Sequence, residues 1–369
     1  MKINITKEKL SEGIQIIQSS VAGRTTLPIL FNFLIEAQDG TIKLTRTDME
    51  MAIIHTFKSE VLEDGSLTVP LKDFSDILKN LPSGKEIVLE SDEDNKLHIK
   101  SGRSKFWVIG TPKSEYPLIP EVEKNKTFNI KVTLLKEMIE KTIFSAAVDE
   151  TRYILNGLLW NNTKDKFEVV STDGRRLALN VNPVLEGVNE FKIIVPKKIL
   201  NEVLKLIGLN KFKEDEVINI TTSSKQISFK IKETLLISRL IEGSYPNYEQ
   251  VIPNKKNITF SVSTSDILSS MKSAEVCVSD LGGTVKYKLT ENNLLITSNS
   301  SKMSFSDEIK VAYEGEDFET SFNPKYLIDV LKNVNTDKVN FSFVNATQPV
   351  LIEPEGETKY KYIIMPVRV

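Results

Sequence analysis

An internal repeat constrains the fold of this chain more than any other feature of its sequence. Three segments open alike, each with a short alternating strand that leads into an amphipathic stretch, at residues 3–10, 128–135 and 260–267. A second landmark is a proline between an apolar segment and another amphipathic stretch. It recurs 126 and 128 residues apart, at Pro70, Pro196 and Pro324. Because this period is too long for one helical hairpin of a solenoid, it indicates a whole domain copied three times.

Each copy repeats the same order of hydrophobic patterns. Apolar residues at helical spacing, such as Leu10, Ile14 and Ile17, predict a first helix. Alternating apolar residues, such as Ile42 and Leu44, predict half-buried strands behind it. The landmark proline predicts the start of a second helix, where its missing N–H costs nothing. The fold class expected is therefore α+β, with three tandem copies of a domain made of two helices and an antiparallel sheet.

Two linkers with the same frame separate the copies. Residues 116–120 and 245–253 both begin with Tyr-Pro and end with Ile-Pro, and charged or polar residues follow each of them. Such turn-rich, polar stretches are typical of domain boundaries. We therefore expect domains at residues 1–120, 127–250 and 251–369.

Composition removes several classes of protein. The 369 residues carry 48 Lys and Arg against 50 Asp and Glu, so the net charge of −2 does not indicate a general polyanion-binding surface. With one cysteine and two histidines, the chain has neither an internal disulfide nor a zinc site built from several Cys or His ligands. The first ten residues lack the apolar core of a signal peptide, and no run approaches the roughly 18 apolar residues of a membrane span. We expect a cytoplasmic protein without cofactor or metal.

Few residues suit catalysis. The nearest match to a phosphate-binding loop, residues 83–86, lacks the hydroxyl and the spacing. His55 and His98 stand in strand-like segments, where a structural histidine is commoner than a catalytic base. Acidic clusters at 92–94, 314–317 and 353–357 could hold Mg²⁺, although predicted turns more often carry solvated charge.

The triple repeat carries five motifs in a fixed order: AGRTTLPIL at 22–30, RYILNG at 152–157, STDGRRLA at 171–178, EGSYPNY at 242–248 and IMPVRV at 364–369. With these motifs the whole chain resembles the family of bacterial DNA polymerase III beta subunits, the DNA sliding clamps. The resemblance implies a non-catalytic processivity factor, a head-to-tail homodimer whose six domains close a ring around double-stranded DNA. A protein retained by topology needs few phosphate contacts, which suits the mildly acidic composition.

The resemblance also implies residues that touch DNA. Arg24 matches the family's DNA-contacting loop, and Tyr153 lies in the matching loop of the second domain. Asp149 stands where we expect a glutamine, and its charge would repel phosphate. Lysines of the predicted helices, Lys197 and Lys198 among them, either solvate those helices or face DNA, and the sequence leaves both interpretations open.

A groove between the second and third domains is implied as the docking site for short linear peptides of the replicative polymerase alpha subunit, the clamp loader, repair polymerases and ligase. Its apolar walls with a polar rim suit peptide anchors, and Pro366 predicts an edge strand near the chain end. The matching positions are Leu155, Thr172, Gly174, Arg175, Arg176, Leu177, Pro246, Val251, Ile363, Met365, Pro366, Val367 and Arg368.

The implied dimer interface places Phe106 of the first domain against Val276 and Cys277 of the third domain of a second copy. Sequence alone would assign these residues to a core, because core and interface share the same chemistry. The sequence leaves two alternatives open: an open three-domain peptide-binding scaffold, and a nucleic-acid enzyme with a carboxylate–metal site.

Overall fold

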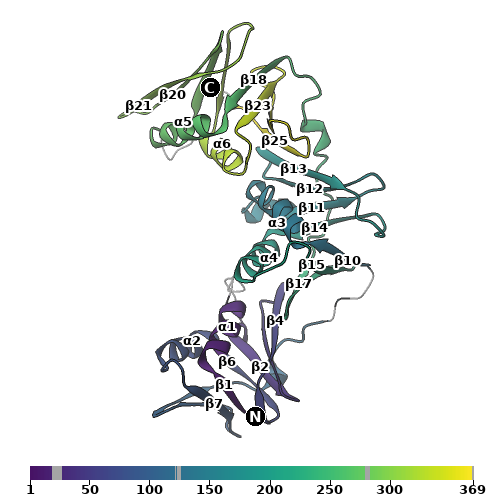
Figure 1. Cartoon of the computed structure of the whole chain (residues 1–369), viewed down its shortest axis with the longest axis vertical. Coiled ribbons are helices and arrows are strands. Elements are labelled where there is room, and N and C mark those ends of the chain that lie inside the picture. Colours follow the sequence, from purple (N-terminus) through teal and green to yellow (C-terminus); the bar gives the residue numbers. More distant parts are fainter. Residues whose placement is uncertain (19–26, 121, 123–125, 279–282, 368–369) are drawn as a thin grey trace. The chain divides into compact units, whose positions relative to one another are not determined.

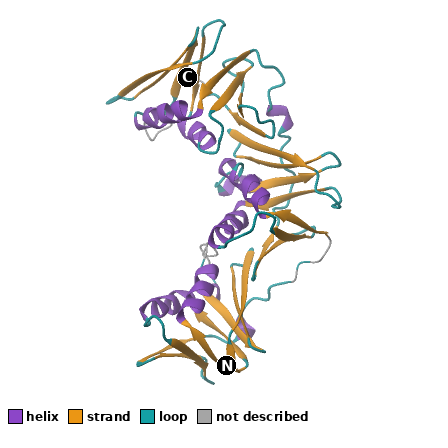
Figure 2. Cartoon of the chain, in the orientation of Figure 1, coloured by secondary structure: helices purple, strands orange, loops and turns teal. Residues whose placement is uncertain are grey.

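A computed structural model describes residues 1–18, 27–120, 122, 126–278 and 283–367 (Figure 1). Its Cα atoms group into two compact units: unit 1 comprises residues 1–135 and 198–240, and unit 2 comprises residues 136–197 and 241–369. In both units the helices lie on one side of antiparallel sheets (Figure 2). The α+β class predicted from the repeat is confirmed.

Unit 1 contains two sheets. One has five strands in the order β5-β1-β7-β8-β9, and the other has eight in the order β10-β15-β16-β17-β4-β3-β2-β6. The strands of the first are β1 (Lys2–Thr6), β5 (Glu60–Glu63), β7 (Glu86–Ser91), β8 (Lys96–Ser101) and β9 (Ser104–Ile109). Those of the second are β2 (Asn32–Gln38), β3 (Thr41–Thr47), β4 (Met51–Lys58), β6 (Gly65–Pro70), β10 (Lys126–Lys131), β15 (Val217–Thr222), β16 (Gln226–Ile231) and β17 (Thr234–Arg239).

The first helix of unit 1, α1 (Lys7–Ile17), begins where Thr6 caps it, since the Thr6 hydroxyl accepts a hydrogen bond from the Lys9 N–H at 3.4 Å. Its apolar stripe Leu10, Ile14 and Ile17 is buried, as the helical spacing predicts. The side chain of Leu44 in β3 lies close to α1, and so do those of His55 and Phe57 in β4. One face of the eight-stranded sheet is therefore closed by helix, and residues one position away in these strands point to the other face.

The landmark prolines sit at the start of the second helix of each copy, as predicted, but not at one position. Pro70 and Pro196 are the last residues of β6 and β14 (Phe191–Pro196), immediately before α2 (Leu71–Asn80) and α4 (Lys197–Leu209). Pro324 is instead the first residue of α6 (Pro324–Leu331), where Asn323 caps the helix. Both places suit a residue without an N–H, because neither requires a helical donor.

Unit 2 also has two sheets, in the orders β14-β11-β12-β13-β25-β24-β23-β18 and β21-β20-β19-β22. Its helices are α3 (Val132–Glu140), which begins in unit 1, α5 (Thr264–Val276) and α6. The remaining strands are β11 (Gly157–Asn162), β12 (Lys166–Thr172), β13 (Arg176–Pro183), β18 (Ile258–Ser263), β19 (Val285–Thr290), β20 (Asn293–Asn299), β21 (Ser304–Lys310), β22 (Phe318–Phe322), β23 (Lys338–Phe343), β24 (Val350–Pro354) and β25 (Tyr360–Ile364).

Each eight-stranded sheet is continuous across two copies of the repeat. In unit 1, β17 of the second copy pairs with β4 of the first, with Leu235 opposite Ile54. In unit 2, β25 of the third copy pairs with β13 of the second, with Ile363 opposite Leu177. Neighbouring copies thus share sheets edge to edge, and each junction is crossed by one of the two Tyr-Pro linkers. The domain boundaries at 1–120, 127–250 and 251–369 stay a prediction.

Candidate peptide groove and DNA-contacting residues

A hydrogen-bonded turn between β12 and β13 positions the polar rim of the candidate groove. The Thr172 hydroxyl donates to the carbonyl oxygen of Arg176 at 2.6 Å and accepts from the Gly174 N–H at 3.0 Å. One carboxylate oxygen of Asp173 accepts from the N–H groups of Arg175 and Arg176 at 2.9 and 3.0 Å. Gly174 has φ +84°, a conformation that favours glycine. The turn explains why Thr172 and Gly174 stand beside the two arginines.

Arg176 is held by three elements. Its Nε lies 3.0 Å from a carboxylate oxygen of Asp173, its Nη1 lies 2.5 Å from Asp329 of α6, and its Nη2 donates to the carbonyl oxygen of Phe144 at 2.8 Å. The guanidinium also stacks on the Tyr326 ring, with its centre 4.7 Å from the ring centroid. Arg176 was predicted as a ligand contact, and this arrangement shows that it also joins the β12–β13 turn to α6.

The apolar part of the groove forms one cluster in unit 2. Leu155, Leu177 and Ile363 are buried in it, and Tyr245 of the second linker packs with them. Leu177 and Ile363 are direct cross-strand neighbours. Val251 and Met365 remain 40% and 39% exposed. The family resemblance implies Leu155, Leu177 and Ile363 as groove residues, and the three lie in this one buried cluster. Tyr245 was not among the predicted groove residues.

The segment after β25 is tied to the same junction. The Met365 N–H donates to the carbonyl oxygen of Arg175 at 2.9 Å, and the Val367 N–H donates to that of Ser321 at 2.8 Å. One prediction was wrong here: β25 is not an edge strand, because it lies between β13 and β24 and ends at Ile364. Pro366 lies after the end of the strand, where its lack of a backbone N–H does not interrupt the hydrogen bonds of the sheet. Pro246 is exposed, and Arg368 lies outside the described residues.

The residues expected to touch DNA have different environments. Tyr153 is 57% exposed, which leaves its ring available. The Lys198 ammonium forms an ion pair with Asp48, and the Lys197 ammonium donates to the carbonyl oxygen of Ala146 at 3.2 Å. Burial lowers the pKa of Lys197, and the nearby Arg176 charge lowers it further. Arg24 lies outside the described residues.

Asp149 has a structural role that the sequence did not reveal. Its side chain caps the 3-10 helix Glu150–Asn156 by accepting from the Thr151 N–H at 2.9 Å. This hydrogen bond, with smaller help from the Arg152 charge, lowers the pKa of Asp149 below its ordinary value. The signal that could have shown this role is an Asp two residues before a threonine at the start of a short helical turn.

The candidate dimer residues lie on exposed edges or near them. Phe106 is 39% exposed on β9, the edge strand of the five-stranded sheet, and Val276 is 66% exposed at the end of α5. Cys277 is only 7% exposed, so its side chain packs mostly within its own unit. Trp107 and Ile109, which were not predicted as interface residues, are 58% and 61% exposed on the same edge strand.

The acidic clusters do not assemble a metal site in the part of the chain that the structure describes, where no group of three or more Asp, Glu, His or Cys is placed to hold an ion. Asp92 instead accepts from the N–H groups of Asp94 and Lys96 and lies 2.7 Å from the His98 ring. Across the same described residues, none of the helices has both the length and the apolar character needed to span a membrane.

Comparison with known proteins covers the whole chain. Residues 1–120 match the N-terminal domain of the DNA polymerase III beta subunit family, residues 129–247 match its central domain, and residues 249–368 match its C-terminal domain. The beta sliding clamp of Proteus mirabilis is 31% identical over 370 residues, and that of Escherichia coli K12 is 30% identical over 370 residues. Both alignments span 100% of each chain.

Solved structures give the same result. A sliding clamp from Bartonella birtlesii, crystallised with griselimycin, superposes with a TM-score of 0.95 at 30% identity and full coverage of both chains. The beta sliding clamp of Caulobacter crescentus superposes with a TM-score of 0.95 at 29% identity, over 100% of this chain and 99% of that one. The likeness therefore extends to all three copies of the repeat and to both sheet junctions.

Proposed function

Because the chain belongs to the family of DNA polymerase III beta subunits, we infer that it is a DNA sliding clamp, a non-catalytic processivity factor of the replicative polymerase. The observation that carries this conclusion is the match of three clamp domains in order over the whole chain, at 31% identity to a full-length clamp. The protein would act in the cytoplasm, at the nucleoid, as DNA replication requires.

The proposed assembly is a head-to-tail homodimer that closes a ring. Its supporting evidence is a pair of edge strands, β9 in the first copy and β21 in the third. Long apolar edge strands attract other strands, and Phe106, Trp107 and Ile109 make β9 such an edge. Phe106 and Val276 would lie in the interface, and Cys277 would support it from beneath.

Within the ring, double-stranded DNA would be held by topology. The net charge of −2 argues against strong adhesion, while Lys72, Lys272 and Lys325 are exposed on helices α2, α5 and α6. These lysines, with Arg24 and Tyr153, would make weak, sequence-independent contacts. Lys197 and Lys198 would contribute mainly through their positive potential, because their ammonium groups already have protein partners.

The proposed partners dock at the groove of Leu155, Leu177 and Ile363. Its buried apolar floor, exposed Met365 and fixed β12–β13 turn suit a short linear peptide, since a flexible methionine adapts to different anchors. The replicative polymerase alpha subunit, the clamp loader, repair polymerases and ligase would compete for this one site. Because we expect no phosphate-binding loop in the chain, an ATP-driven loader would open the ring.

Retention on DNA tests the proposed function. The protein, loaded by a clamp loader onto a nicked circular plasmid, should remain bound through gel filtration in high salt and should leave soon after a restriction enzyme linearises the plasmid. Equal loss from circular and linear DNA would contradict encirclement. As a control, both ends of the linear DNA are blocked. If the protein is then retained again, it had left through the DNA ends and not because the cut destroyed a binding sequence.

A further inference from the structure

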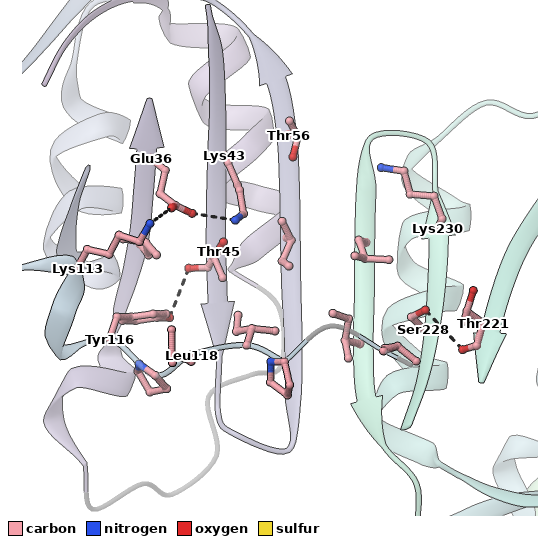
Figure 3. A pocket seen from close by; sticks show the side chains of 18 residues that line it. Glu36, Lys43, Thr45, Thr56, Lys113, Tyr116, Leu118, Thr221, Ser228 and Lys230 are labelled. Carbon is pink, nitrogen blue, oxygen red and sulfur yellow. Dashed lines mark hydrogen bonds and ion pairs between the residues drawn. The ribbon is translucent and has the colours of Figure 1, made fainter. Parts of the chain in front are cut away.

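A second groove lies in unit 1, on the sheet face opposite helix α1 and beneath the first linker (Figure 3). Its volume is about 660 Å³, within the range typical of ligand sites. A row of cross-strand neighbours forms its floor, because β2, β3, β4, β17 and β16 align their outward residues. We call this site the first-linker groove; its floor row is Leu34, Thr45, Ile54, Leu235 and Lys230.

The second copy of the repeat has an equivalent surface in unit 2, and comparing the two copies shows which residues correspond. The turn at Thr47 has the same hydrogen bonds as the turn at Thr172: its hydroxyl donates to the Met51 carbonyl oxygen at 2.8 Å and accepts from the Met49 N–H at 2.9 Å. This match sets a constant offset of 125 residues between the strands of the first two copies. Leu34, Thr45 and Ile54 therefore correspond to Leu159, Val170 and Leu179 in unit 2.

In unit 2 the second linker itself fills the equivalent space. Leu159, Val170 and Leu179 are buried in one cluster with Tyr248, a residue of that linker. The Tyr248 hydroxyl donates to a carboxylate oxygen of Glu168 at 2.8 Å. Between its Tyr-Pro and Ile-Pro ends the second linker is longer by four residues than the first. The shorter first linker has no counterpart of Tyr248.

In unit 1 the first-linker groove therefore contains a polar group without a hydrogen-bond partner and an apolar side chain exposed to solvent. Thr45 is 2% exposed, yet among the described residues its hydroxyl oxygen has no hydrogen-bond partner. A buried hydroxyl without a partner is costly, so one is expected to meet a ligand or water. On the linker above, Leu118 is 95% exposed. Figure 3 shows the linker crossing the sheet, with Tyr116 anchored to the carbonyl oxygen of Thr45.

The charge of the groove differs from that of its filled counterpart. Lys43 takes the position of Glu168, and Lys113 and Lys230 also line the groove. Glu36 is the carboxylate among the lining residues, and it lies 3.0 Å from the Lys43 ammonium and 2.6 Å from that of Lys113. Three cations against one anion leave a positive rim, which attracts an acidic ligand.

We propose that the first-linker groove is a docking site for a short linear segment of a partner protein that carries an aromatic side chain next to an acidic residue. The aromatic ring takes the place that Tyr248 occupies in unit 2, over Leu34 and Ile54. Its polar end, or the neighbouring carboxylate, meets Lys43, and the Thr45 hydroxyl gains a partner. This site is separate from the peptide groove of Leu155, so one ring can hold a second partner on each subunit.

The test uses the segment whose Tyr248 packs in the equivalent space of unit 2. An acetylated, amidated peptide with the sequence of residues 246–252, PNYEQVI, is added to the full-length protein with labelled Thr, Ile and Leu methyl groups. Methyl signals of Thr45, Ile54 and Leu235 should shift and saturate with a Kd of about 1 mM or tighter, as expected for one aromatic anchor. The same peptide with alanine in place of tyrosine should not saturate them.

Two variants that replace a groove residue by the corresponding residue of the second copy of the repeat test where the peptide binds. Lys43→Glu should weaken the peptide about tenfold, because it replaces the attracting charge by a repelling one, whereas Lys211→Glu, an exposed control in the same unit, should not. Thr45→Val should weaken binding about threefold while leaving the thermal midpoint unchanged or higher, since it removes an unpartnered hydroxyl.

The proposal would be overturned by the absence of a saturable shift at the floor row, by shifts confined to the Leu155 groove, or by equal affinity of the peptide for the wild type and Lys43→Glu. N-acetyltyrosine amide serves as a further probe. If it binds as tightly as the peptide, the site recognises a small aromatic molecule and the peptide proposal is wrong.

Discussion

At the scale of single residues, His55 makes the stability of unit 1 depend on pH. It is 8% exposed against α1, and its Nδ1 lies 2.9 Å from the Thr234 hydroxyl. Burial lowers its pKa from the ordinary 6.5 to about 4; Glu233 opposes this shift and Lys230 adds to it. Because the folded pKa lies below the unfolded value, protons bind preferentially to the unfolded chain as the pH falls from 6.5 towards 4.

His55→Gln removes this titration. Between pH 7.5 and pH 5 the wild type should lose about 2 kcal/mol of unfolding free energy more than the variant, measured by urea unfolding at one protein concentration. Above about pH 7.5 the difference between the two proteins should not change with pH, because His55 is then neutral in both the folded and the unfolded chain. Parallel pH profiles down to pH 5 would show that His55 is protonated in the folded state.

The equivalent turns of the first two copies differ in backbone strain. Met49 has φ +74° and is half exposed, while Gly174 occupies the same position of the second turn with φ +84°. Met49→Gly should raise the unfolding free energy by about 0.5 kcal/mol, because glycine relieves a left-handed conformation. Gly174→Ala should lower it by about 1–2 kcal/mol, because the new methyl group also meets the Arg152 guanidinium. Chemical denaturation measures both, and equal effects of the two variants would contradict the argument.

At the scale of elements, the exposed edge of β9 should decide assembly. Phe106→Lys places a charge on an apolar edge, which is how natural proteins block strand pairing. We expect the variant to sediment as a monomer at concentrations where the wild type is a dimer, with an unchanged circular dichroism spectrum. Arg103→Ala, in the turn before the same strand, is the control that should leave the dimer intact. If Phe106→Lys dimerises with unchanged affinity, the dimer interface does not involve β9.

The elements also show what the sequence can and cannot reveal. Helical spacing predicted α1 through Leu10, Ile14 and Ile17, because one buried stripe suffices to define a helix. The pairing of β4 with β17 could not be predicted, since alternation shows which face of a strand is buried and not which strand lies beside it. The apolar residues of the Leu155 groove were predicted by family resemblance. The first-linker groove was not predicted, because it arises where the first linker is four residues shorter than the second, and sequence alone does not show which surface a linker covers.

At the scale of the whole molecule, the proposed ring closure and the proposed partner docking involve different residues, so a variant that abolishes one should leave the other intact. Truncation after Ile364 removes Met365 to Val369, together with the hydrogen bond from Met365 to Arg175. The proposed interface strand β9 and the exposed Val276 are far from this segment in sequence. The truncated chain should therefore still form the dimer and still be retained on circular DNA.

The same truncation should remove partner binding at the groove of Leu155. A peptide from the replicative polymerase alpha subunit should bind the wild type and lose at least about tenfold in affinity for the truncated chain, measured by fluorescence polarisation, because the rim loses its adaptable methionine and its backbone anchor. Met365→Leu, which keeps an apolar side chain of similar volume, should retain most of the affinity. Unchanged affinity after truncation would refute the groove, whereas loss of the dimer would show that the chain end also supports the ring.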